Sequence, residues 1–164
     1  MAHIYSITYQ PVDQPYEGER FSAFIRVPVE EARLIAGHGI EGDAKAGRNP
    51  RRQLNLLSYE WLEELRQQGY QTEPGAFGEQ LIIRGLDVLA LQTGERLRLG
   101  GEACIEITKP RTGCTRLEAA QGISIPKEAL KAGIGVLATV ITSGVIRVGD
   151  TVEVVRQEDR LAAL

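Results

Sequence analysis

The segment KPRTGC, Lys109 to Cys114, places a cysteine after two basic side chains and a glycine, and Arg116 adds another base just beyond it. A short helix is expected to begin directly after the thiol, so the thiol would lie at the positive end of a helix dipole. The dipole and the cations both favour thiolate, the form that attacks electrophiles, carries persulfide sulfur or ligates a metal. Cys114 is therefore a candidate functional thiolate, although a structural turn cysteine explains these local features equally well.

The second cysteine, Cys104, lies within ACIEITK, where apolar and polar residues alternate. This pattern predicts a mid-strand position on the more polar face and a structural role, since cysteine packs as a small hydrophobe. The two cysteines are ten residues apart without a C-x-x-C motif. That spacing argues against a zinc knuckle.

Two glycine-rich segments carry candidate polar residues. In GHGIEGDAKAG, Asp43 and the loop amides could form the floor of a polar pocket, and a simple tight loop is the alternative. In EPGAFGEQL, Glu79 and Gln80 either point into a site or cap their loop. Between these segments, GRNPRRQ brings three arginines together. They form either a solvated basic edge or an anion site held by arginine forks.

Short alternating or β-branched runs separated by glycine turns dominate the chain and predict a mostly-β fold, a closed or nearly closed β-barrel. Ser58 and Gly69 are the expected cap residues of one helix, with Trp61 in the core. Shorter helices are expected at Thr115–Gln121 and from Pro126 to Gly133. The expected strands are Ile4–Tyr9, Phe21–Val27, Gln53–Leu57, Gln80–Arg84, Arg96–Leu99, Ala103–Lys109, Val136–Thr142, Val145–Val148 and Thr151–Val155.

Length and composition bound the class of protein. The chain has 164 residues, 43% of them apolar, and a formal net charge of −3. One domain over residues 1–164 is expected, with a tail at 156–164. The net charge argues against a nucleic-acid coat. Without a signal peptide or an apolar run long enough to span a bilayer, the cytoplasm is the expected compartment.

Taken together, these segments resemble the MOSC domain, named for the C-terminal domain of molybdenum-cofactor sulfurases. The resemblance covers about residues 20–155 and rests on blocks in the family's order. They are GIEGDA, RQLNLLS, PGAFGEQL, GLDVLALQTGERLRLGGEACIEIT, KPRTGC and GVIRVGDTVEV.

The resemblance implies a β-barrel with one functional cysteine, which maps onto Cys114, as a persulfide carrier or as a ligand of molybdenum in a pterin cofactor. Arg111 would hold the anionic cofactor or stabilise the thiolate. The further cofactor-binding candidates are Asp43, Lys45, Arg52, Glu79 and Gln80. Three positions depart from the family pattern: Gly113 replaces a proline, Gln80 an asparagine and Lys45 a histidine.

Three functions follow as hypotheses. The first is a molybdenum-cofactor protein that reduces N-hydroxylated small molecules with electrons from a partner protein. The second is a sulfur carrier that receives persulfide sulfur on Cys114 from a separate cysteine desulfurase. The third is a non-catalytic ligand-binding barrel, which the three departures favour.

Overall fold

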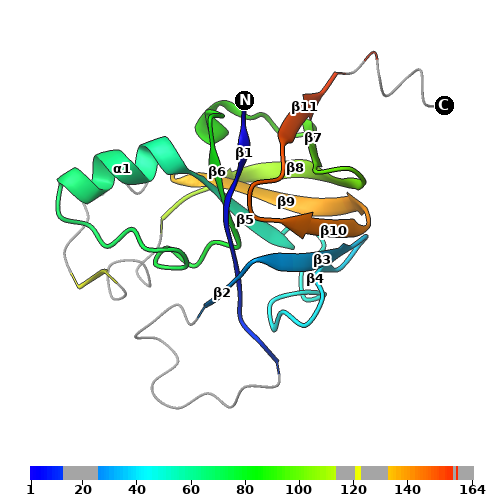
Figure 1. Cartoon of the computed structure of the whole chain (residues 1–164), viewed down its shortest axis with the longest axis horizontal. Coiled ribbons are helices and arrows are strands. Elements are labelled where there is room, and N and C mark those ends of the chain that lie inside the picture. Colours follow the sequence, from blue (N-terminus) through cyan, green and yellow to red (C-terminus); the bar gives the residue numbers. More distant parts are fainter. Residues whose placement is uncertain (13–25, 114–120, 123–132, 157, 159–164) are drawn as a thin grey trace.

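The computed structural model describes residues 1–12, 26–113, 121–122, 133–156 and 158. Strands dominate this part of the chain (Figure 1). One α-helix, α1 (Tyr59–Gln67), and one 3-10 turn, η1 (Val88–Ala90), accompany them among the described residues. The strands are β1 (His3–Tyr9), β2 (Val27–Val29), β3 (Glu31–Ile35), β4 (Gly39–Ile40), β5 (Leu54–Ser58), β6 (Leu81–Arg84), β7 (Arg96–Leu99), β8 (Ala103–Arg111), β9 (Gly135–Thr142), β10 (Gly144–Arg147) and β11 (Val152–Val155).

The strands form two sheets. Eight lie in the order β11-β7-β8-β9-β5-β6-β1-β2, and three lie in the order β10-β3-β4. Among the pairs in the described residues, only β5 and β6 are parallel, and the connection between them carries α1. The prediction of a mostly-β fold with few helices is confirmed. The sheets are not closed, so the term barrel applies only loosely.

The start of β1 is hydrogen-bonded to the segment that leads into β11, the last strand. Ile4 N–H donates to Asp150 O (2.9 Å), Gly149 N–H donates to Ile4 O (2.8 Å), and Val152 N–H donates to Ala2 O (3.0 Å). An isolated bridge between His3 and Thr151 completes this contact. The first strand is thus held by the segment that leads into the last one.

Alternation along the strands builds the core as the sequence predicts. In β8, Ala103, Ile105 and Ile107 are buried, whereas the residues between them are half-buried. Cys104 is one of these half-buried residues, which confirms its expected place on the more polar face. Strand β5 is buried at all its positions because the main core covers one face and a smaller cluster around Leu62 of α1 covers the other.

Helix α1 has the predicted ends. Ser58 has extended backbone angles (φ −88°, ψ 129°), but its hydroxyl donates to the Glu60 carboxylate (3.2 Å) and accepts no capping backbone N–H. At the other end, Gly69 has φ +94°, and its N–H and that of Tyr70 close a Schellman motif. Trp61 was expected in the core and is only half-buried, since Leu62 is the residue of α1 that points inward.

Other differences concern short or undescribed segments. Strands β3 and β4 were not predicted, because β4 has only two residues and β3 mixes charged and apolar side chains. Most of the expected strand Phe21–Val27 lies outside the described residues, as do the expected helices after Cys114 except Gln121 and Gly133. Within the described ranges, no helix has the length and apolar character needed to cross a membrane.

Candidate functional site

The loop that precedes β6 is organised by the carboxylate of Glu79. Gly75 N–H donates to Oε2 (2.5 Å) and Phe77 N–H donates to Oε1 (3.1 Å), so both oxygens bind the loop's own backbone. Glu79 is only 1% exposed. Burial raises its pKa, while the backbone hydrogen bonds and nearby Arg111 act in the opposite direction. The carboxylate therefore caps the loop from inside.

Two arginines with buried side chains donate to backbone carbonyls of the same loop. Arg111, the last residue of β8, donates through Nη2 to the carbonyl of Phe77. Arg26, just before β2, donates through Nη2 to the carbonyl of Gly78 (2.9 Å). The side chain of Arg26 is only 6% exposed, and this desolvation lowers its pKa. The loop carbonyls are thus held by guanidinium groups from the end of β8 and from the residue before β2.

Arg26 links this loop to the glycine-rich turn after β4. Its Nη1 lies 3.7 Å from Asp43 Oδ1. Gln80 Nε2 donates to Asp43 Oδ2 (3.2 Å), and Gln80 Oε1 accepts the N–H of Asn55 (2.8 Å). The predicted residues Asp43, Glu79 and Gln80 therefore meet in one buried network around Arg26.

Arg26 was missed at the sequence level. The available signal was an arginine inside the apolar run FSAFIRV, where a charged side chain needs a partner. Gly75 is a second sign that Arg26 lies against this loop. It has φ +90°, and a Cβ there would lie 2.6 Å from Arg26 Cβ. Only glycine lets the loop backbone approach the arginine this closely.

The other basic candidates lie at the edge of the network. Lys45 is half-buried, and its backbone N–H donates to Asp43 Oδ1 (3.2 Å). Arg52 is exposed, and its N–H donates to Asn49 O (3.1 Å). The basic turn is tied to β8, because the Thr108 hydroxyl donates to Arg51 O (2.5 Å).

Cys114 lies outside the described residues. The chain can be followed to Gly113, and it reaches the surface at Thr112. Arg111 is buried, Thr112 is exposed, and Gly113 is half-buried. Arg111 O accepts the N–H of Ile134 (2.8 Å), which fixes the base of this segment against the start of β9. The cysteine therefore follows a rigid base by three residues.

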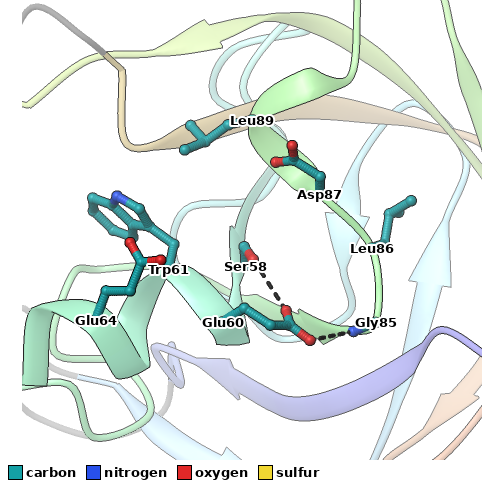
Figure 2. A pocket seen from close by; sticks show the side chains of 8 residues that line it. All are labelled: Ser58, Glu60, Trp61, Glu64, Gly85, Leu86, Asp87 and Leu89. Carbon is teal, nitrogen blue, oxygen red and sulfur yellow. Dashed lines mark hydrogen bonds between the residues drawn. The ribbon is translucent and has the colours of Figure 1, made fainter.

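A pocket of about 450 Å³ opens between the start of α1 and the segment after β6 (Figure 2). Its lining includes Trp61, whose ring packs edge-on against Phe77 (5.7 Å between centroids). Leu89 lines the opposite part and lies next to Gly133. Phe77 O accepts from Arg111, and Ile134, the residue after Gly133, donates to Arg111 O, so the pocket flanks the base of the segment that leads to Cys114.

The residues that could bind a metal can be compared with the molybdenum cofactor that the resemblance to the MOSC domain implies. Within the described ranges, no group of three or more His, Cys, Asp or Glu side chains could hold a metal ion. A molybdenum ion in a pterin cofactor brings its own sulfur ligands, so it needs few ligands from the protein. A single thiolate fits such a cofactor, and the buried guanidinium of Arg111 gives the base of its segment a positive charge.

These features define a mostly-β protein with a clamped polar loop beside the end of β8, three residues before Cys114 in the sequence. A family model for the MOSC domain matches residues 43–153, more than half of the chain, and the chain belongs to this family. The match includes Asp43, Glu79, Gln80, Arg111 and Cys114. Among curated protein sequences, none matches the chain significantly.

Solved structures share the fold. YiiM from Geobacillus stearothermophilus is 19% identical with a TM-score of 0.72, over 96% of this chain and 76% of that one. YuaD from Bacillus subtilis is 18% identical with a TM-score of 0.70, over 94% and 96%. YiiM from Escherichia coli is 26% identical with a TM-score of 0.66, over 96% and 71%. The first two likenesses show the fold alone.

Proposed function

We propose that this protein binds a molybdenum cofactor through Cys114 and reduces N-hydroxylated small molecules. The observation that carries the proposal is the position of Arg111, buried at the end of β8 and fixed to the Phe77 carbonyl, three residues before the cysteine. Membership of the MOSC family supports the same assignment. When bound, the cofactor would supply the two-electron reduction R–NH–OH + 2e⁻ + 2H⁺ → R–NH₂ + H₂O, with electrons from a partner protein.

The chain's own residues have separate tasks in this proposal. Cys114 is the metal ligand, and Arg111 holds the segment before it while its charge favours thiolate. Arg26, Asp43, Glu79 and Gln80 keep the supporting loop in one conformation through their mutual contacts. Lys45 and Arg52, nearer the surface, would contact the anionic part of the cofactor. The thiolate requires a reducing compartment, for which we propose the cytoplasm.

A sulfur carrier is the second candidate, because Thr112, two residues before the cysteine, is exposed. A persulfide on Cys114 would be accessible there to a desulfurase and to an acceptor. The two functions differ in what the purified protein contains: the first predicts molybdenum and pterin, and the second predicts cyanide-releasable sulfur without metal.

The test uses protein purified without oxygen from cells that make the cofactor. Molybdenum is measured by mass spectrometry and pterin by fluorescence after oxidation. Activity is measured as the reduction of phenylhydroxylamine with reduced methyl viologen as electron donor. We expect about one molybdenum per chain and measurable reduction in the wild type, and loss of both in Cys114→Ala. Cys104→Ala is the matched control and should keep both.

Three results would decide against the reductase. If Cys114→Ala keeps its molybdenum and its activity, Cys114 is not the ligand. If wild-type protein lacks molybdenum but releases thiocyanate on cyanide treatment only when Cys114 is present, the sulfur carrier replaces it. If the wild-type protein holds neither molybdenum nor labile sulfur and shows no activity, the non-catalytic barrel is the correct description.

A further inference from the structure

The pocket beside α1 has a composition that the proposed cofactor does not explain. Its charged lining is acidic: Glu60 and Glu64 come from the helix and Asp87 comes from the segment before η1. A phosphorylated pterin is an anion and would be repelled by these carboxylates. The pocket therefore suits a ligand of the opposite charge.

Two of the three carboxylates are available to a ligand. Glu60 is already engaged, because its Oε2 accepts from Ser58 Oγ (3.2 Å) and its Oε1 accepts from Gly85 N–H (2.7 Å) (Figure 2). Glu64 and Asp87 are exposed, and no cation of the described part of the chain forms an ion pair with either of them. They give the pocket a net negative charge that no described residue neutralises.

The remaining wall is apolar and held in place. Trp61, Leu86 and Leu89 line it, and Leu89 is 40% exposed. The indole of Trp61 is fixed by its edge-on contact with Phe77, which is itself buried. Figure 2 shows Trp61 and Glu64 on the helix side and Leu89 and Asp87 on the other wall. A ligand between these walls would meet an aromatic ring and two carboxylates at once.

We propose that this pocket binds a small organic cation with a flat apolar body. Its body would pack against Trp61 and Leu89, and its positive end would lie between Glu64 and Asp87. Aromatic rings and carboxylates both attract cations, and a cavity of about 450 Å³ is within the usual size of small-molecule sites. A metal ion does not account for the pocket, because its acidic residues do not form a metal-binding group in the described structure. This proposal does not depend on the proposed reductase.

The test uses the chain's single tryptophan as the reporter. Because Trp61 is the only tryptophan, the protein has one indole N–H cross-peak in a ¹⁵N–¹H spectrum. Benzamidinium is the cationic probe, and benzamide is a neutral molecule of nearly the same shape. We expect saturable shifts of the indole cross-peak with benzamidinium, and binding of benzamide weaker by about 10-fold or more, since two carboxylates contribute.

Variants test whether Glu64 and Asp87 bind the positive end of the probe. Glu64→Gln and Asp87→Asn should each weaken benzamidinium binding by about 3- to 10-fold without altering benzamide binding. Glu63→Gln is the matched control: Glu63 is on the same helix, outside the pocket, and pairs with Arg66 (3.8 Å). It should bind like the wild type. Equal affinity for the two probes, unchanged affinity in both pocket variants, or no saturable shift of the indole peak would each overturn the proposal.

Discussion

Replacing Gly75 by alanine tests the contact that joins the clamped loop to Arg26. Gly75 has φ +90°, and an added Cβ would lie 2.6 Å from Arg26 Cβ and 3.1 Å from its Cγ. The arginine cannot move away cheaply, because its Nη2 is bonded to Gly78 O (2.9 Å) and its Nη1 lies 3.7 Å from Asp43. The substitution thus combines backbone strain with a clash against a buried ion pair.

The magnitude follows from these two contributions. A non-glycine residue at positive φ costs about 1–2 kcal/mol. Overpacking a buried contact costs about 1–3 kcal/mol more. We expect Gly75→Ala to lower the free energy of unfolding by about 2–5 kcal/mol. In a chain of 164 residues this corresponds to a fall in Tm of roughly 5–15 °C.

Gly69 provides a matched control for the backbone contribution alone. It has φ +94°, nearly the same as Gly75, and a Cβ there would have nothing within 4 Å. Gly69→Ala should therefore cost only about 1–2 kcal/mol. Both variants are measured by urea denaturation followed by circular dichroism. Equal losses in the two variants would refute the packing argument, since the difference between them measures the contact with Arg26.

Two further predictions concern the same network. Burial raises the pKa of Glu79, so the folded protein binds its proton more tightly than the unfolded chain does. The free energy of unfolding should fall as pH rises from the ordinary pKa of glutamate, about 4.3, to the raised folded value. When the free energy of unfolding is measured by urea denaturation across this pH range, it should depend less on pH in Glu79→Gln than in the wild type. An unchanged pH dependence would show that Glu79 is not the group whose pKa is raised. Gln80→Ala leaves Asn55 N–H and Asp43 Oδ2 without the amide that now joins them, so we expect a loss of about 2–4 kcal/mol. The exposed Gln92→Ala should lose less than about 0.5 kcal/mol, and a similar loss in both variants would show that the network contributes nothing.

The sequence predicted several strands closely. The bounds of β7 agree fully, and those of β8 and β9 differ by two residues or fewer. The helix ends were predictable because Ser58 and Gly69 have local backbone preferences that do not depend on the rest of the fold. Local preference could not predict β4, whose two residues are held by pairing with β3 and by burial of Ile40 in the core.

The candidate site was predictable only as a set of residues. The turn chemistry around Asp43 and Glu79 marked two loops, but nothing in either loop shows that they meet. Their contact is made by Arg26 and Gln80, and it depends on the pairing of β5 with β6 across α1. Such pairing is a property of the whole topology, so spacing in the sequence does not reveal it. The pocket beside Trp61 was missed because a half-buried tryptophan and a core tryptophan give the same helical pattern.

The contact between β1 and the segment before β11 has a consequence for the protein's synthesis. Ala2 and Ile4 receive their partners from residues 149–152, so this edge of β1 stays unpaired until those residues have been synthesised. Until then, the strand exposes unpaired backbone N–H and C=O groups, which can bind chaperones or pair with the wrong strand. Joining segments so far apart in the chain also carries a large ring-closure entropy. Closure of this edge of β1 is therefore expected only after β10 has been synthesised.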